Sequence, residues 1–409
     1  MMLKINADRL WQSLMEMAKV GATAKGGVRR LALTSEDTAG RALFAAWCRE
    51  AGLSLSVDRV GNLFARREGR EAGAAVASGS HLDTQPEGGR FDGVYGVLAA
   101  LEVVRTLNDA DIVTRKPIEI VVWTNEEGAR FTPAMLGSAA FTGVMPLETA
   151  LGTQDADGVT LSDALATSGY QGERAVPGDR FDAYFEAHIE QGPVLEEAGV
   201  PVGVVTGGQA IRWLDVRVTG RAAHAGTTPM QYRKDALFGA ADMASELEAI
   251  AVDFFPQGLA TIGEWHIHNA SRNTIAGELM FTVDLRNPSD AAIEEMEAAV
   301  RTRFEATAAR RGLTIDITQH WVSPSTPFDP ACIDAVQEAV SELGYVNQRI
   351  VSGAGHDAIH LAKHCPTAMI FIPCVDGLSH NEAEDALPED VARGADVLLH
   401  AMLARAGRA

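Results

Sequence analysis

The chain has 409 residues, 46% of them hydrophobic and 22% charged, which is the composition of a folded globular protein rather than a disordered one. This length exceeds one compact core, so we expect two domains. The formal net charge of −20 opposes binding to nucleic acid. No apolar run reaches the roughly 18 residues that a membrane-spanning helix needs, so we expect no membrane partner either.

The N-terminal segment and the cysteines point to an intracellular setting. Asp8 and Arg9 interrupt the apolar stretch that a signal peptide needs, so we expect a cytoplasmic protein. The four cysteines form no Cys-x-x-Cys pair, which argues against a structural zinc knot and against a disulfide framework. Cys374 is expected to be a small packed residue rather than a nucleophile.

Residues 74 to about 205 alternate short β-branched runs with helical periodicity, which predicts a parallel α/β sheet. Segments 74–78 and 117–124 are expected to be buried strands, and 96–107 a crossover helix between them. Each strand is followed directly by a cluster of polar residues. Open α/β sheets place their functional sites at this carboxyl edge.

The pattern changes after residue 210. The alternating and helical periodicities predict strand, helix, strand, strand, helix, strand, which is the ferredoxin-like order, over 212–219, 234–251, 260–268, 277–286, 290–311 and 313–319. We therefore expect an inserted α+β domain over 211–323.

The last part of the chain returns to the α/β pattern. A helix over 329–343, a buried strand over 367–372 and a helix over 388–405 are expected. The predicted fold class is therefore α/β, with a discontinuous main domain, 1–210 and 324–409, around the inserted domain.

Imidazole and carboxylate groups gather after the predicted strands. His81 and Asp92 follow the first strand, and the pair Glu126-Glu127 follows the second. Taken singly, such residues are often hydrogen-bonded loop histidines or solvated acidic pairs. Their joint placement, with His188 and His380 near two further strand-like runs, instead favours a two-metal hydrolytic site, because divalent cations bind neutral imidazole nitrogen and a carboxylate can bridge two of them.

Five segments, in order along nearly the whole chain, carry a family resemblance. They are Gly79-Ser80-His81-Leu82-Asp83-Thr84, Thr124-Asn125-Glu126-Glu127-Gly128-Ala129-Arg130-Phe131, His188-Ile189-Glu190-Gln191-Gly192-Pro193, Ala223-His224-Ala225-Gly226-Thr227-Thr228-Pro229-Met230 and Ser379-His380-Asn381-Glu382. The chain resembles the hydantoinase/carbamoylase amidases, which belong to the larger group of dinuclear-metal aminoacylases and peptidases.

The resemblance implies a role for each residue of the predicted metal site. Asp92 bridges two divalent ions, and the remaining ligands are His81, Glu127, His188 and His380. Asp83 is not a metal ligand but contacts the ligand His81 and fixes the tautomer of its imidazole. Glu126 is the general base. Mn²⁺, Zn²⁺, Co²⁺ and Ni²⁺ all accept these nitrogen and oxygen ligands.

The resemblance also implies residues that bind the substrate. His224 of the inserted domain stabilises the oxyanion in the site of a neighbouring subunit, which implies a homodimer. Gln191, Asn273, Arg286 and the loop 353–357, which contains Gly355, contact the substrate. The alternatives are a strand-end turn histidine for His224 and a salt-bridged strand-end residue for Arg286. The family often has proline where this chain has Ala276, which bears on substrate choice.

The implied activity is the hydrolysis of a small molecule, an N-carbamoyl-L-amino acid or a close ureido acid, to the amino acid, carbon dioxide and ammonia. Allantoate amidohydrolase is the nearest alternative, and a related aminoacylase or dipeptidase comes third. A metal-binding protein without turnover is a fourth possibility. The presence of Glu126 together with the full ligand set argues against it.

Overall fold

The computed structural model describes residues 2–409, which form two compact units. Unit 1 contains the chain up to Gly207 together with Pro327–Ala409, and unit 2 is the continuous segment Gly208–Thr326. The expected inserted domain, 211–323, begins and ends three residues inside unit 2.

Unit 1 is built on a mixed sheet in the order β1-β2-β4-β3-β5-β16-β6-β14, with β15 paired to β6. Its strands are β1 (Ser54–Val57), β2 (Leu63–Arg67), β3 (Val76–His81), β4 (Ile118–Trp123), β5 (Ala183–Ile189), β6 (Val202–Gly208), β14 (Thr326–Pro327), β15 (Asn347–Ser352) and β16 (Thr367–Ile372). The four central strands, β4, β3, β5 and β16, are parallel neighbours.

The expectation of a parallel sheet as far as residue 205 is wrong for the last strand of that region. β6 runs antiparallel to β16. The connection from β5 to β6 contains only the five-residue helix α7 (Val194–Ala198), so the chain turns back instead of making a full crossover. On the other side of the sheet, β2 pairs antiparallel with β4.

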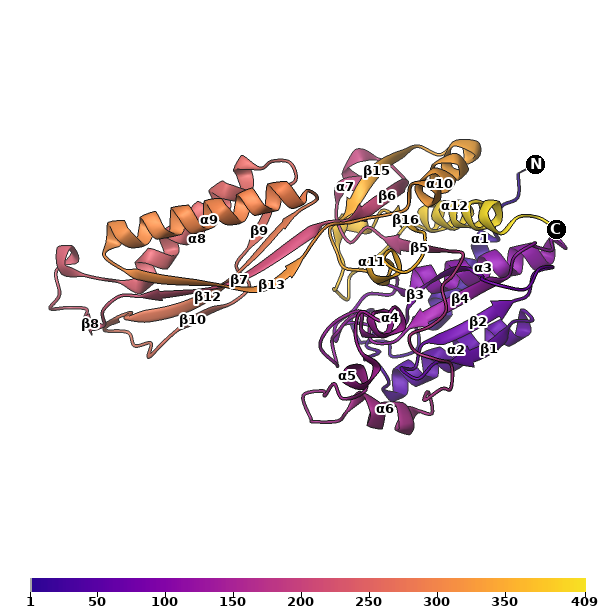
Figure 1. The fold of residues 1–409 in the computed structure, drawn as a ribbon, viewed down its shortest axis with the longest axis horizontal. Helices are drawn as coiled ribbons and strands as arrows, with labels where there is room; N and C mark the ends of the chain where they lie inside the picture. The colour runs from indigo at the N-terminus through magenta and orange to yellow at the C-terminus, as the bar shows by residue number, and fades with distance from the viewer. Residues whose placement is uncertain (1) are drawn as a thin grey trace. The chain divides into compact units, whose positions relative to one another are not determined.

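The helices of unit 1 enclose the sheet and its core. They are α1 (Ala7–Met17), α2 (Ser35–Glu50), α3 (Val94–Asp109), α4 (Leu136–Phe141), α5 (Leu147–Leu151), α6 (Leu161–Ser168), α7, α10 (Pro330–Leu343), α11 (Asp357–Leu361) and α12 (Pro388–Ala406) (Figure 1). α3 is buried almost all round because it lies on β3 and is covered by α1 and α12. Within residues 2–409, no helix is long and apolar enough to cross a bilayer.

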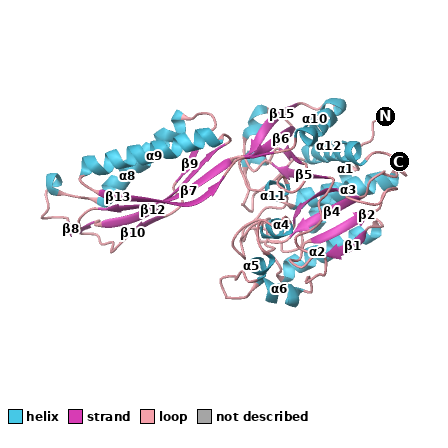
Figure 2. Cartoon of the chain, viewed as in Figure 1, coloured by secondary structure: helices cyan, strands magenta, loops and turns pink. Residues whose placement is uncertain are grey.

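Unit 2 has a sheet in the order β10-β12-β7-β13, with β9 also paired to β12. The strands are β7 (Ala210–Thr219), β9 (Leu259–Thr261), β10 (Trp265–Ile267), β12 (Glu278–Asn287) and β13 (Thr314–Ser323). Two helices, α8 (Ala236–Asp253) and α9 (Asp290–Arg311), cover one face (Figure 2). Side chains on β7 and β12 alternate between buried and more exposed, as a sheet covered on one face requires.

The elements of unit 2 follow the expected ferredoxin-like order with one correction. The strand expected over 260–268 is divided into β9 and β10 at Gly263 and Glu264. There the Glu264 N–H donates to the Thr282 hydroxyl oxygen at 3.0 Å instead of to a backbone carbonyl. A separate two-stranded ladder, β8 (Ala223–His224) with β11 (Thr274–Ile275), completes the unit.

Candidate active site

The parallel strands of unit 1 bring the predicted ligands to one edge of the sheet. His81 is the last residue of β3 and lies opposite Trp123, the last residue of β4. His188 lies in β5 beside Phe371 of β16. Because the carboxyl ends of parallel strands meet at one edge, residues far apart in the sequence converge there.

Two backbone turns with positive φ shape this edge. Asn125 (φ 55°) turns the chain after β4, and its side-chain amide donates to the Phe131 carbonyl at 2.7 Å, so Glu126 and Glu127 follow a fixed bend. Gly93 (φ 67°) precedes α3, and a Cβ placed there would lie 2.4 Å from atoms of the His81 ring. Glycine at position 93 therefore leaves room for His81.

Asp92 lies at the centre of the ligand set. Its Oδ1 is 3.2 Å from His188 Nε2 and 3.6 Å from His81 Nε2. Its Oδ2 is 3.4 Å from His380 Nε2, which is also 3.4 Å from Glu127 Oε2. The two oxygens of one carboxylate thus face two separate groups of donors.

Both buried histidines direct the same nitrogen toward Asp92. The other nitrogen, Nδ1, lies 2.8 Å from the Asp83 carbonyl oxygen in His81 and 2.9 Å from the Ile189 carbonyl oxygen in His188. A carbonyl oxygen can only accept, so Nδ1 carries a proton in both rings and Nε2 is the nitrogen that would bind a metal ion. The Gly93 N–H also lies 3.2 Å from His188 Nε2.

This donor set fits two divalent cations. One possible ligand group is His81, Asp92 and His188, and the other is Asp92, Glu127 and His380. Ligands bound at about 2.1 Å around a tetrahedral ion lie about 3.4 Å from one another, which is the spacing found here. Burial opposes ionisation of Asp92, but the surrounding imidazoles of His188, His380 and His81 hold the pKa of its carboxyl well below its usual value.

Glu126 has the surroundings of a proton-transferring group. It is buried, and its Oε2 lies 3.5 Å from His81 Nε2. Burial raises the pKa of its carboxyl well above the usual value, and the negative charges of Asp357 and Glu127 add to this effect. Burial and Asp92 also raise the pKa of Glu127 to about 7. A raised carboxyl pKa suits a group that accepts and later donates a proton near neutral pH.

Asp83 contacts His81 as expected, through its backbone. The group that orients His81 is the backbone carbonyl of Asp83, not its carboxylate. The carboxylate instead accepts the backbone N–H groups of Glu126 and Glu127, each at 3.3 Å. Asp83 therefore orients His81 at the end of β3 through its carbonyl, and the Glu126-Glu127 turn after β4 through its carboxylate.

Of the two residues expected to bind substrate in unit 1, Gln191 contacts this centre, and Gly355 lies beside Met135, whose N–H donates to the Glu126 carbonyl oxygen at 2.7 Å. The Gln191 amide nitrogen donates to Asp92 Oδ2 at 2.9 Å, and Gln191 adopts a positive φ of 60°. Gly355 lies between β15 and α11, where a Cβ would come within 3.1 Å of the Met135 side chain.

The residues expected to bind substrate in unit 2 fall into two groups. His224 lies opposite Thr274 in the β8-β11 ladder, and the Ala225 N–H donates to the Asn273 carbonyl oxygen at 2.8 Å, so His224 and Asn273 lie together. Arg286 lies near the end of β12, where its Nη2 is 2.8 Å from Asp284 Oδ2. Leu259 of β9 is its neighbour across the sheet.

Three side chains in the site were missed by the sequence reasoning. Gln85 donates its side-chain amide to Glu127 Oε2 at 2.8 Å. Ser379 donates to Asp92 Oδ2 at 2.9 Å, and Glu384 accepts the Asp92 N–H at 3.1 Å. The available signal was their nearness in sequence to His81, Asp83 and His380. A further possible ligand group, Glu186, His188 and His356, is buried and shares His188 with the centre.

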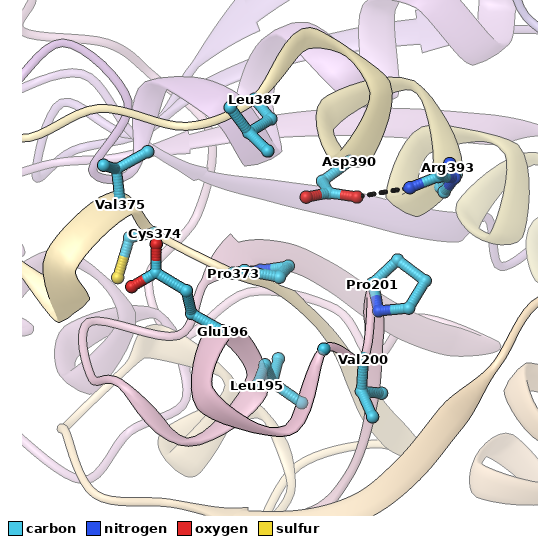
Figure 3. A pocket seen from close by; sticks show the side chains of 11 residues that line it. Leu195, Glu196, Val200, Pro201, Pro373, Cys374, Val375, Leu387, Asp390 and Arg393 are labelled. Carbon is cyan, nitrogen blue, oxygen red and sulfur yellow. Dashed lines mark hydrogen bonds and ion pairs between the residues drawn. The ribbon is translucent and has the colours of Figure 1, made fainter.

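A separate cavity of about 220 Å³ in unit 1 contains Cys374 (Figure 3). The Cys374 thiol is buried and lies 3.5 Å from the Gly192 carbonyl oxygen. Burial raises its pKa to about 11, so the thiol stays protonated at neutral pH. This agrees with the interpretation of Cys374 as a packed residue. The cavity is otherwise lined mainly by apolar side chains and by the Asp390–Arg393 ion pair.

Comparison with known proteins identifies the family. Residues 77–404 match the model of peptidase family M20/M25/M40. An N-carbamoyl-L-amino-acid amidohydrolase of Rhizobium meliloti is 47% identical over 98% of this chain and 96% of its own length. A crystal structure of a hydantoinase/carbamoylase family amidase from Burkholderia ambifaria has a TM-score of 0.96 and 65% identity, with all of both chains covered.

A more distant relative has a different printed activity. It is a ureidoglycolate hydrolase of Oryza sativa, 33% identical over 97% of this chain and 84% of its own length. All of these relatives are hydrolases or amidases by name. The chain therefore belongs to peptidase family M20/M25/M40 and, within it, to the hydantoinase/carbamoylase amidases, which are hydrolases of linear carbon–nitrogen bonds.

Proposed function

We propose that this enzyme hydrolyses the carbamoyl group of N-carbamoyl-L-amino acids with two divalent metal ions in the unit 1 site. The observation that carries the proposal is Asp92, whose two oxygens face two donor groups, His81 with His188 and Glu127 with His380. The candidate ions are Mn²⁺, Zn²⁺, Co²⁺ and Ni²⁺. When bound, such ions lower the pKa of a water molecule and polarise a carbonyl group.

The protein side chains supply the proton transfers. Glu126 takes a proton from the attacking water and delivers it to the leaving nitrogen, because its buried carboxyl lies beside the metal ligands and has a raised pKa. Asp83 fixes the turn that contains Glu126, because its carboxylate accepts the Glu126 backbone N–H at 3.3 Å. Hydrolysis converts the N-carbamoyl amino acid and one water molecule to the amino acid, carbon dioxide and ammonia.

Substrate recognition is proposed for Gln191, Gly355, Asn273, Arg286 and His224. The Arg286 guanidinium already binds the Asp284 carboxylate through two nitrogens, so its geometry suits the carboxylate of an amino acid. In the alternative interpretation, Arg286 is a salt-bridged strand-end residue, and its contact with Asp284 is purely structural. His224 is exposed and close to Asn273, and we assign it to oxyanion stabilisation.

The geometry within unit 2 supports a site shared between two subunits. Arg286 is eight residues along β12 from Glu278, a separation of about 26 Å at about 3.3 Å per residue. The ladder that carries His224 and Asn273 continues beyond Glu278, and Figure 1 shows β8 and β9 at opposite ends of unit 2. One small substrate cannot touch both groups of a single unit 2.

We therefore propose a homodimer in which Arg286 comes from one subunit and His224 with Asn273 from the other. Mixing inactive Glu126→Gln with inactive His224→Ala should restore activity, since a heterodimer then has one site with both residues intact. If subunit exchange is demonstrated and no activity returns, the shared site is wrong. The cytoplasmic location expected from the sequence stays a prediction.

Ureidoglycolate or allantoate hydrolysis is the second candidate function, because the Oryza sativa relative bears the name ureidoglycolate hydrolase. The identity to the N-carbamoyl-L-amino-acid amidohydrolase is higher, 47% against 33%. The deciding experiment compares N-carbamoyl-L-amino acids, their D-enantiomers, allantoate, ureidoglycolate and N-acetyl amino acids on metal-reconstituted enzyme, with released ammonia and free amino acid as readouts. Turnover confined to allantoate or ureidoglycolate would replace the main proposal.

A further inference from the structure

Glu384 connects the two loops that carry Asp92 and His380. Its Oε1 accepts the backbone N–H groups of Phe91 at 2.9 Å and of Asp92 at 3.1 Å. Its Oε2 lies 3.0 Å from the Ser379 hydroxyl, which also lies 2.9 Å from Asp92 Oδ2. One carboxylate thus contacts the backbone of Asp92 directly and its side chain through Ser379.

The surroundings of Glu384 are built to hold this side chain. It is fully buried, although glutamate is rarely buried without specific partners. A Cβ added at Gly89 would lie 2.1 Å from the Glu384 carboxyl group, so the loop before Asp92 leaves room for it only because residue 89 is glycine. The two loops are nearly 300 residues apart in the sequence, and no strand pairing joins them.

We propose that Glu384 is a positioning residue that sets the distance between Asp92 and His380, and thereby the affinity for the ion held by Asp92, Glu127 and His380. His380 needs such support, because its side chain is 51% exposed and it adopts a positive φ of 53°. Without the carboxylate, two buried N–H groups lose their acceptor and the Ser379 hydroxyl loses one of its two carboxylate neighbours. The inference rests on the proposed two-metal site.

The test uses Glu384→Ala, Glu384→Gln and a matched control on the same loop, Asp385→Ala. Asp385 forms an ion pair with Arg90 at 2.9 Å but does not contact the backbone of Asp92. Each protein is stripped of metal and titrated with Mn²⁺ and with Zn²⁺ against a competing chelator. Bound metal is measured by elemental analysis, and folding by circular dichroism.

We expect Glu384→Ala to bind the second metal equivalent 10- to 100-fold more weakly, the usual effect of removing a side chain that orients metal ligands. Glu384→Gln should recover much of this loss, because its amide oxygen still accepts the N–H groups of Phe91 and Asp92. Asp385→Ala should bind both ions like the parent enzyme. The two measurements separate positioning from general stability. Weaker metal binding by a variant that is folded by circular dichroism reports positioning, whereas a general loss of stability also changes the circular dichroism.

The outcomes distinguish this inference from the proposed function. If the parent enzyme binds no metal, the proposed two-metal site is wrong. A parent that binds two ions, with Glu384→Ala binding both equally well, overturns the role of Glu384 alone. If Glu384→Ala does not fold, Ser379→Ala removes the contact between Glu384 and the Asp92 side chain, together with the bonds of Ser379 to Asp92 and Gln191, and leaves the bonds of Glu384 to the Phe91 and Asp92 backbone. At least threefold weaker binding of the second ion then supports the proposal, and unchanged binding overturns it.

Discussion

Replacement of Gly93 by alanine tests whether the fold places His81 as a metal ligand. The added Cβ would lie 2.4 Å from three atoms of the His81 ring, about 1 Å closer than ordinary van der Waals contact. The ring must therefore move by about 1 Å or the turn before α3 must shift. Either change alters the distance from His81 Nε2 to Asp92 Oδ1, which is 3.6 Å in the structure.

The expected energetic cost has two parts. Gly93 adopts φ 67° and ψ −48°, the rare and strained γ-turn conformation, so alanine there costs about 1–3 kcal/mol. Crowding against a packed ring adds typically about 1–3 kcal/mol. Gly158→Ala is a matched control, because Gly158 has a φ of 80° but nothing within 4 Å of the added Cβ. The control should lose stability from the backbone alone and keep its metal affinity.

The assay measures the free energy of unfolding by urea for the metal-free proteins, and metal content after dialysis. Gly93→Ala should lose more stability than Gly158→Ala and should bind the ion of the His81 group at least tenfold more weakly. Two tightly bound metal ions in Gly93→Ala, at the affinity of the parent enzyme, would refute the assignment of His81 as a ligand.

Two further substitutions separate catalysis from binding. Glu126→Gln should lower kcat by about 10²–10⁴-fold while both ions stay bound, because an amide cannot carry the proton; near-normal kcat in steady-state assays would remove Glu126 from the mechanism. Arg286→Lys should raise KM by about 10-fold or more with a smaller change in kcat, because lysine cannot form the bidentate pair with a substrate carboxylate. An unchanged KM for N-carbamoyl amino acids would leave Arg286 with only its contact to Asp284.

The convergence of the site could be predicted because it follows from strand topology. His81 and the Glu126-Glu127 pair were expected at one edge of the sheet since both predicted strands were buried and parallel, and β3 and β4 are parallel neighbours. The division of the strand over 260–268 was not predicted. At the break, the Glu264 N–H bonds to the Thr282 hydroxyl of β12, a contact distant in sequence that leaves no mark on local periodicity.

The positioning contacts could not be predicted for the same reason. Glu384 and Asp92 are joined by a bond between a side chain and a distant backbone N–H, so neither residue type nor spacing reveals it. The role of Asp83 shows a subtler limit. The residue was expected behind His81, but only the structure shows that its carbonyl, not its carboxylate, contacts the ring.

The most direct test of the central claim is a metal titration of the enzyme with two simultaneous readouts. Metal-free protein receives increasing Mn²⁺ or Zn²⁺, and bound metal and ammonia released from an N-carbamoyl-L-amino acid are measured in the same samples. We predict no activity without metal and full activity only as occupancy approaches two ions per chain, since Asp92 faces two donor groups. Full activity in protein shown by elemental analysis to hold no metal, or only one ion, would contradict the two-metal account.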